Sequence, residues 1–385
     1  MKTGMLRFTA LLLLLLLLAG CAGTAEPASL LIPYDAHYPK DQASWQNYLT
    51  TENVIYHRAE NLLYFCLTGE TVFYPLCGKP NCGHSSPDCN AWLPGGSGIG
   101  YHKGRLYAVI QGGSVDPENG SFCTLVSMEP TGDNRREELA IPSIRYSDGT
   151  TGCAAYFLFH EDRLFCFLEA DMDAPYAEQI HRLIVVDLGT LEMNEPFKEL
   201  FSKHARLGID AQAAGDCIYA KAELPQPDGS RVFLLLELNM DSGKIRELAS
   251  NFESITDWYI EGNMLYYLKS GEGFIEINLN NGAVQNNGLP VEELQKAVWS
   301  DNLICALGNL SEDWNDVDVY YFDREYRLLD QMHLTGGILP CYYGKDMLLF
   351  RVWNAQPTDM PMYFMDRAAI GSGELELRLL GESGA

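Results

Sequence analysis

The chain has 385 residues and a formal charge of −25, with 52 acidic against 27 basic side chains. This acidity argues against nucleic acid as a partner and against docking on anionic lipid by charge, because both need a basic surface. With 47% hydrophobic and 21% charged residues the chain can bury a sizeable core, which excludes wholesale disorder. The 35 Gly and 21 Tyr favour turns and strands over helices.

The N-terminus has the pattern of an export signal. Lys2 and Arg7 precede an unbroken leucine run over residues 11–18, which is too short to span a bilayer. The ending Leu18-Ala19-Gly20-Cys21 resembles the lipobox of bacterial lipoproteins. The resemblance implies that residues 1–20 are a signal peptide and that Cys21 is lipidated, with residues 21–29 as a tether. We therefore expect a protein outside the cytoplasm, anchored to the cell membrane by Cys21; the alternative is an ordinary secretory signal.

A turn residue followed by an apolar strand recurs along the rest of the chain. The pattern occurs seven times, and its first apolar residues are Val54, Leu106, Leu164, Ile218, Leu265, Leu303 and Leu348. A further strand and a hairpin turn, such as Asn280-Asn281-Gly282, follow these positions, and another strand, such as residues 338–343, precedes most of them. The repeat unit is therefore four short antiparallel strands.

Four-stranded units of roughly 40–50 residues are typical of β-propeller blades, which bury their faces against neighbouring blades. The sequence predicts an all-β protein in which residues 30–385 form one propeller, with seven blades and with six or eight as alternatives. A β-sandwich or two smaller β domains would also give many short strands. The first unit shows three obvious strands, at 54–57, 62–67 and 71–76. Its fourth strand should come from 29–34, from near 45–49, or from the C-terminus by ring closure.

A cysteine- and histidine-rich insert at residues 77–92 interrupts the repeat between the first two units. Cys77, Cys82, His84 and Cys89 are spaced C-x4-C-x-H-x4-C, and three cysteines with one histidine are a familiar ligand set for Zn²⁺. Four protein ligands would complete the coordination shell, so we expect a structural zinc site. The alternatives are one disulfide with a leftover thiol, or free thiols.

Other cysteines fall inside apolar strand patterns. Cys66, Cys166 and Cys305 are each flanked by large apolar residues and should be small buried hydrophobic side chains. Many unpaired thiols in an exported protein would suit an anaerobic host.

The insert also carries a family resemblance. Residues 76–84 and 88–92 resemble a segment of exported lipoproteins from anaerobic Firmicutes, whose propeller domains of unknown function are related to the TolB type. The resemblance implies the propeller fold and the extracytoplasmic location, and it implies no activity.

The sequence lacks the common catalytic signatures, including the Gly-x-Ser-x-Gly elbow, His-Glu-x-x-His and the phosphate-binding loop. An acidic segment could bind Ca²⁺, but it lacks the EF-hand spacing and is better explained as a solvated loop; it contains Glu312, Asp313, Asn315, Asp316 and Asp318. Five aromatic residues fall on or beside predicted inner strands, where they could bind a ligand or pack between blades. They are Trp258, Tyr259, Trp299, Tyr342 and Tyr343.

These observations favour recognition over catalysis. We expect a monomeric binding module for a protein, peptide or glycan, attached to the membrane through its N-terminal lipid and with no nucleic-acid partner. The alternatives are a hydrolase or lyase acting on carbohydrate or peptide at the propeller channel, and an envelope scaffold protein.

Overall fold

The protein is a seven-bladed β-propeller whose blades are four-stranded antiparallel sheets, with one additional short strand in blade 4. The computed structural model describes residues 48–51, 54–59, 61–67, 70, 72–94, 98–116, 121–142, 144–145, 151–152, 154–170, 180–202, 206–207, 211–226, 230–250, 257–300, 302–344, 346–352 and 362–379. They belong to one compact unit, Tyr34–Ala385. The predicted signal peptide (residues 1–20), the predicted tether (21–29) and the predicted lipidation site Cys21 lie outside the described residues.

The first three blades follow the chain without strand exchange. Blade 1 contains β1 (Tyr48–Thr50), β2 (Val54–Ala59), β3 (Leu62–Leu67) and β4 (Tyr74–Pro75). Blade 2 contains β5 (Ile99–His102), β6 (Arg105–Asp116), β7 (Ser121–Met128) and β8 (Arg136–Pro142). A short ladder of β9 (Ile144–Arg145) and β10 (Thr151–Gly152) precedes blade 3, which contains β11 (Ala154–His160), β12 (Arg163–Ala170), β13 (Ile180–Asp187) and β14 (Met193–Asn194).

The remaining blades keep the same order, and blade 4 adds a variation. A short helix, α2 (Lys198–Ser202), precedes blade 4. There β15 (Arg206–Leu207) and β16 (Gln212–Ala214) both pair with β17 (Cys217–Pro225), followed by β18 (Arg231–Asn239) and β19 (Ile245–Ser250).

Blades 5 to 7 are regular. Blade 5 contains β20 (Trp258–Glu261), β21 (Met264–Lys269), β22 (Gly273–Asn278) and β23 (Val284–Asn286). Blade 6 contains β24 (Leu294–Ser300), β25 (Leu303–Gly308), β26 (Val317–Phe322) and β27 (Leu328–Leu334). Blade 7 contains β28 (Ile338–Tyr343), β29 (Met347–Val352), β30 (Met362–Asp366) and β31 (Arg378–Leu379), with the 3-10 helix η3 (Arg367–Ala369) after β30.

All seven apolar positions that marked the repeat lie in the second strand of a blade, which confirms the predicted blade number. Each position directly follows a tight turn from the first strand. Gly215 and Gly262 occupy such turns with φ values of 53° and 58°, where a side chain would be strained. The two-residue turn therefore fixes the register of the first hairpin in these blades.

The fourth strand of blade 1 is its first strand, β1. It pairs with β2 through Tyr48 opposite His57 and Thr50 opposite Ile55. Of the three sources considered from sequence, the segment near 45–49 is therefore the right one, and closure by a C-terminal strand is wrong. The predicted strand at 71–76 is also shorter in the structure, where β4 covers only Tyr74–Pro75.

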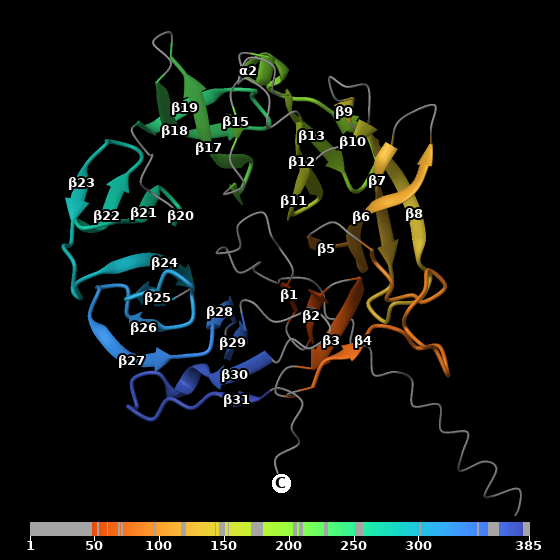
Figure 1. The fold of residues 1–385 in the computed structure, drawn as a ribbon. Coiled ribbons are helices and arrows are strands. Elements are labelled where there is room, and N and C mark those ends of the chain that lie inside the picture. Colours follow the sequence, from red (N-terminus) through yellow and green to blue (C-terminus); the bar gives the residue numbers. More distant parts are fainter. Residues whose placement is uncertain are drawn as a thin grey trace, which may run out of the picture. The chain divides into compact units, whose positions relative to one another are not determined.

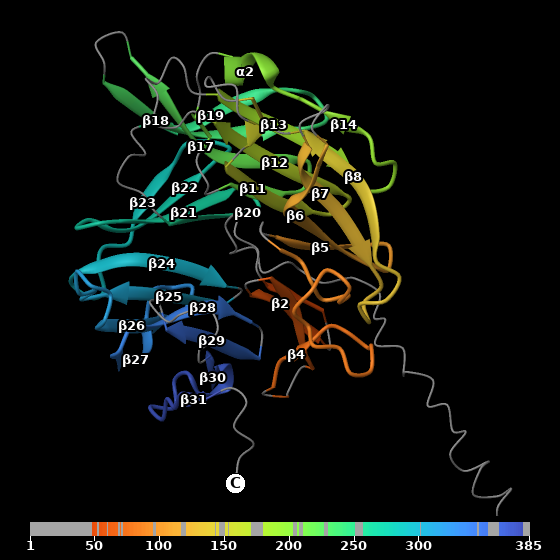
Figure 2. The same ribbon diagram turned by 45° about the vertical axis from the view of Figure 1, so that its right-hand side comes forward.

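Blades 7 and 1 close the ring by side-chain packing. Tyr48 and Ile55 of blade 1 share a buried cluster with Tyr342, Met347 and Leu349 of blade 7. Figures 1 and 2 show β28–β31 beside β1–β4 in both views. Each blade is contiguous in sequence, so among the described strands none from one end of the chain completes a blade at the other end.

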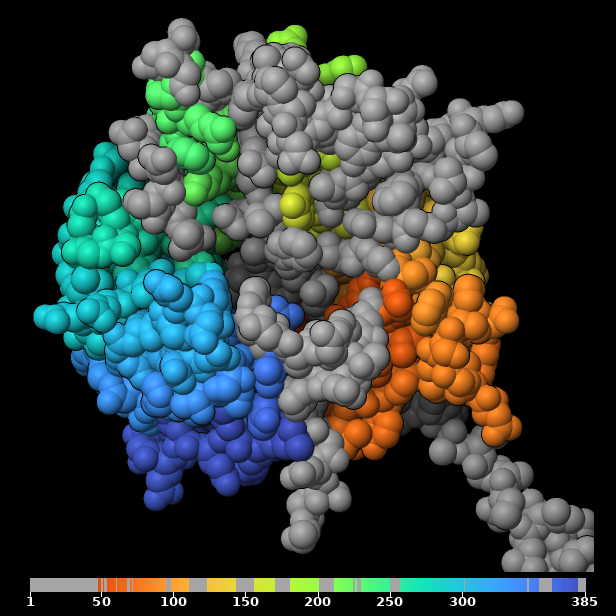
Figure 3. All heavy atoms as spheres, in the orientation of Figure 1, coloured from red at the N-terminus to blue at the C-terminus, as the bar shows by residue number. Residues whose placement is uncertain are grey.

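The core lies between the blades. Buried residues form separate clusters shared by blades 1 and 2, 2 and 3, 3 and 4, 4 and 5, 5 and 6, and 6 and 7. The teal residues of blade 5 and the light-blue residues of blade 6 abut in Figure 3. Cys66, Cys166 and Cys305 are at most 2% exposed and carry free thiols, which confirms their predicted burial. No helix among the described residues is long and apolar enough to cross a membrane.

An Asx turn recurs after the third strand and was not predicted from the sequence. In blades 3–7 an Asp or Asn at the end of this strand accepts backbone N–H bonds from residues two to four positions later. These residues are Asp187, Asn239, Asn278, Asp323 and Asp366. Their side chains supply the acceptors that a tight outer hairpin lacks.

Replacing one of these residues should cost a modest amount of stability. Asn278 Oδ1 accepts the N–H groups of Asn280 and Asn281 at 3.0 and 3.3 Å, so Asn278→Ala should lower the free energy of unfolding by about 1 kcal/mol. Urea unfolding measures the change. Asn280→Ala alters an exposed side chain of the same turn and should change stability by less than about 0.5 kcal/mol. Equal effects of the two variants would contradict the role of the Asx turn.

Candidate metal centre

The cysteine- and histidine-rich loop connects the outer strand of blade 1 to the inner strand of blade 2. Both of its ends are fastened to β3. At the start, the N–H of Leu76 donates to the carbonyl of Leu63 at 2.8 Å; at the end, the N–H of Leu63 donates to the carbonyl of Ala91 at 2.9 Å. An isolated bridge between Leu62 and Trp92 extends this pairing. The loop is thus closed at its base, which brings residues 77 and 89 near each other.

Two backbone positions with unusual conformations shape the loop. Asn81 and His84 have φ values of 60° and 51°, in the left-handed region that asparagine and histidine tolerate better than most residues. Turns at Lys79–Cys82 and Ser86–Cys89 place further N–H groups on carbonyls within the loop. The chain therefore folds back on itself twice between the first and last cysteine.

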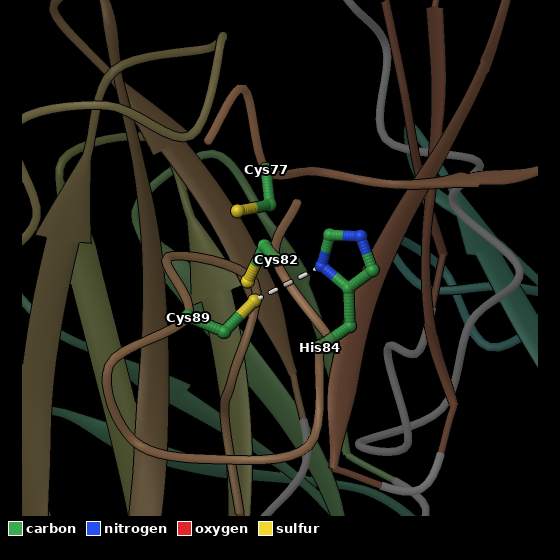
Figure 4. A group of neighbouring side chains, drawn as sticks. All are labelled: Cys77, Cys82, His84 and Cys89. Atoms are coloured by element: carbon green, nitrogen blue, oxygen red, sulfur yellow. Dashed lines mark hydrogen bonds between the residues drawn. The ribbon is translucent and has the colours of Figure 1, made fainter. Parts of the chain in front are cut away.

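This backbone brings together the four side chains that the sequence predicted as ligands. The sulfur atoms of Cys77, Cys82 and Cys89 and a ring nitrogen of His84 all lie within 4.8 Å of one another, as Figure 4 shows. Nδ1 of His84 is 3.3 Å from Sγ of Cys89. All three cysteines carry free thiols in the structure. The group, hereafter the Cys/His centre, could hold a metal ion.

Hydrogen bonds to sulfur distinguish the thiols of the Cys/His centre. Burial raises the pKa of Cys77, but the backbone N–H groups of Lys79 and Asn90 and the neighbouring thiols outweigh it, so that its pKa is lowered. Burial raises the pKa of Cys89 to about 11, although the N–H of Ala91 partly offsets this. N–H groups aimed at sulfur stabilise the thiolate, which is the form that ligates a metal.

The Cys/His centre adjoins the core between blades 1 and 2. Cys89 is 1% exposed and belongs to this core, together with Leu76, Ala91 and Leu93 of the same loop. Cys77 and Cys82 pack against the cluster from the outside and are half-buried. A metal ion held there would therefore fix the joint between two blades.

Blade 2 holds the far side of the loop through the turn between β7 and β8. Arg135 donates through Nη1 to the carbonyls of Trp92 and, at 3.4 Å, of Cys89. Asn90 donates to Asp133 at 3.3 Å. Gly132 lies so close to the loop that a Cβ there would meet the carbonyl oxygen of Leu76 at 2.3 Å. These contacts make the loop part of the interface between the blades.

A buried arginine completes the joint from blade 1. Arg58 in β2 is 3% exposed, and its two terminal nitrogens donate to the carbonyls of Val109 in blade 2 and Leu93 in the loop, both at 2.8 Å. Burial, and then the charge of Arg135, lowers the pKa of Arg58 to about 10. Neither arginine was predicted from the sequence. The side chain of Arg58 continues the alternation of Val54 and Tyr56 in β2, and this pattern could have predicted its burial. No sequence pattern indicates the role of Arg135.

The five aromatic residues considered as ligand contacts all lie on first strands. Trp258, Tyr259, Trp299 and Tyr342 are at most 5% exposed and pack in the clusters between blades, and Tyr343 packs at the edge of the cluster between blades 6 and 7. The structure shows their packing contacts, and ligand binding by these residues stays a prediction.

The acidic segment after β25 is internally hydrogen-bonded. Asp313 accepts hydrogen bonds from the hydroxyl of Ser311 and from Asn315, and these bonds lower the pKa of its carboxyl group. Asp318 instead accepts from Asn309 at 2.6 Å and lies 2.8 Å from Nδ1 of His333. The carboxylates therefore serve the loop and its flanking strands, in keeping with a solvated loop.

Comparison with known proteins supports the fold. No protein-family model and no curated protein matches the chain. A structure from work on two prolyl endopeptidases aligns with a TM-score of 0.56 and 10% identity over 89% of this chain and 51% of that one, so the chain spans about half its length. BamB from Moraxella catarrhalis aligns with a TM-score of 0.42 and 9% identity over 91% and 87% of the two chains. The computationally designed Ika8 protein aligns with a TM-score of 0.44 and 11% identity over 88% and 87%. Only the first of these alignments has a TM-score above 0.5, and at 10% identity it supports the fold alone and indicates no activity.

Proposed function

We propose that the protein is a lipid-anchored, extracytoplasmic binding module that recognises a protein, peptide or glycan, and that zinc in the Cys/His centre stabilises its first blade joint. It resembles the exported lipoprotein propellers of anaerobic Firmicutes in its lipobox and its Cys/His loop. A propeller is a fold commonly used for binding.

The observation that carries the binding proposal is that blades 3, 6 and 7 have long connections at the end opposite the tight turns between first and second strands. First and second strands are joined by tight turns, for example at 161–162, 215–216 and 262–263. Connections from second to third strands, such as 171–179 and 353–361, leave the opposite end of each blade because the strands alternate in direction. Long connections on a rigid scaffold are where proteins place recognition residues.

The chemistry of the Cys/His centre favours zinc. Three thiolates and one imidazole suit a tetrahedral Zn²⁺ ion, and four protein ligands leave no open position for a substrate or a reactive water. The ion would therefore act as a structural cross-link between the start and the end of the loop. Its position beside the joint between blades 1 and 2 agrees with a structural role.

A binding screen tests the proposal. The full chain should bind a member of a glycan or peptide array, and replacing residues 171–179 by a short Gly-Ser linker should weaken binding at least tenfold. Asn280→Ser in a tight outer turn is the matched control and should leave binding unchanged. Turnover of the bound glycan or peptide would favour the hydrolase or lyase alternative. Absence of binding together with co-purification of a membrane protein would favour the scaffold alternative, and either result would contradict the proposal.

The anchor has a separate test. Cells that express the chain and are supplied with a labelled fatty acid should incorporate the label into the protein. The Cys21→Ser variant should not be labelled and should leave the membrane fraction. Label that persists in the Cys21→Ser variant would contradict lipidation at this residue.

A further inference from the structure

The proposed zinc site has a charge that its own ligands do not balance. Three thiolates carry three negative charges and Zn²⁺ supplies two positive ones, so a loaded Cys/His centre with a neutral imidazole has a net charge of −1. The centre is partly buried, with Cys89 in the core between blades. A net charge that is removed from water is costly unless an opposite charge lies close by.

Arg135 is placed to supply that opposite charge. It approaches the centre from blade 2 and donates to the carbonyls of Cys89 and Trp92. The guanidinium of Arg135 therefore contacts the backbone of one candidate ligand, Cys89, and places a positive charge beside the centre.

Glu137 in β8 also attracts the positive charge of Arg135. The remaining charged groups of the region have other partners. Lys79 donates to the carbonyl of Asp88 within the exposed part of the loop. Asp133 accepts from Asn90 and Thr131, and Glu129 accepts from Asn134, so both carboxylates are held in the blade 2 turn. Arg58 adds a second positive charge, but it donates to Val109 and Leu93, one residue beyond the carbonyl of Trp92 that Arg135 holds.

We infer that Arg135 is a positioning residue of the Cys/His centre. It fixes the peptide carbonyl of Cys89 by a hydrogen bond. Its positive charge balances the negative charge of a metal ion bound by three thiolates. The inference rests on the proposed zinc site and assigns a role to a residue outside the ligand set. Blade 2 would thereby contribute to metal affinity although all four ligands come from the loop. Metal loading would in turn strengthen the hold of blade 2 on the loop, because linkage is reciprocal.

Charge and hydrogen bonding can be separated by two substitutions. Arg135→Gln keeps an amide donor and removes the charge, whereas Arg135→Lys keeps the charge and loses the planar fork. Arg136→Gln changes the neighbouring exposed arginine and is the matched control. The full chain and these variants are purified without oxygen, and zinc affinity is measured by competition with a chromophoric chelator. Thermal unfolding of the metal-free proteins shows whether each variant folds.

Arg135→Gln should weaken zinc binding about 10- to 100-fold, as loss of outer-shell partners does at other metal sites. Arg135→Lys should retain more affinity than Arg135→Gln, and Arg136→Gln should remain within about twofold of the unchanged protein. Since the effect is electrostatic, the deficit of Arg135→Gln should shrink as salt is raised from low to high concentration, and a purely structural role would not produce this dependence.

Three results would overturn the inference. Arg135→Gln could bind zinc as tightly as Arg136→Gln, which removes any role for Arg135. Arg135→Lys could lose as much zinc affinity as Arg135→Gln, with no dependence on salt. Only the hydrogen bonds of the guanidinium would then matter, and its charge would not. The unchanged protein could bind no zinc, and this result, unlike the first two, would also remove the proposed metal site.

Discussion

Replacing Cys82 by serine should abolish stoichiometric metal binding and lower the stability of the metal-loaded protein by about 4 kcal/mol or more. A ligand present at a thousand times its dissociation constant stabilises the folded state by about that amount, and structural zinc sites commonly bind more tightly. Cys82 is half-buried and packs at the margin of the core, so the substitution itself removes little apolar contact. The lost stability should therefore come mainly from the lost metal ion. Differential scanning calorimetry with and without added zinc measures it.

The matched control is Cys217→Ser. Cys217 is also a half-buried free thiol, but it lies in blade 4 and accepts a hydrogen bond from Asn239 at 3.3 Å, which a serine oxygen can also accept. This variant should keep its metal and lose less than about 1 kcal/mol. If a chelator lowered the melting temperature of Cys82→Ser as much as that of the unchanged protein, Cys82 would not be a ligand.

Replacing Arg58 by alanine should destabilise the protein by about 3–5 kcal/mol. The substitution leaves the carbonyls of Val109 and Leu93 without their donor in a buried interface, at about 1–3 kcal/mol each, and creates a cavity as well. Arg58→Met fills most of the volume but supplies no donor, so most of the loss should persist in that variant. Denaturant unfolding gives both values.

Arg378→Ala provides the contrast. Arg378 is an exposed arginine of β31 that pairs with exposed Glu376, and surface pairs of this kind contribute little. Its removal should cost less than about 1 kcal/mol. A full recovery of stability in Arg58→Met would show that volume alone, without hydrogen bonding, explains the burial of Arg58.

The propeller could be predicted from the sequence because its repeat depends on local features, a turn residue followed by an apolar strand. A turn residue before an apolar strand is needed in every blade, so Val54, Ile218 and Leu348 look alike although they lie in different blades. The closing strand of blade 1 could not be predicted in the same way. β1 has only three residues, Tyr48–Thr50, and three segments were long enough to provide it. Which segment forms this strand depends on the packing of Tyr48 against Tyr342, two residues that are far apart in the chain.

The four side chains of the Cys/His centre could be predicted from the sequence as candidate metal ligands, but their place in the joint between blades 1 and 2 could not. Soft ligands at short spacing in a loop with few apolar residues already indicate a metal site. The contacts that surround it come from Arg58 and Arg135, which lie in other elements and reach the loop only after blades 1 and 2 have packed. Their partners are mainly backbone carbonyls, which every sequence offers equally. Long-range hydrogen bonds of this kind leave no pattern in a single sequence.

Metal analysis of the full chain, purified without oxygen and without added zinc, tests directly whether a metal ion stabilises the joint between blades 1 and 2. Elemental analysis should find about one zinc per chain, and X-ray absorption should show three sulfur ligands at about 2.3 Å and one nitrogen at about 2.0 Å. Less than about 0.3 zinc per chain, together with failure to take up added Zn²⁺ or with a disulfide among Cys77, Cys82 and Cys89, would contradict a metal-stabilised joint between blades 1 and 2.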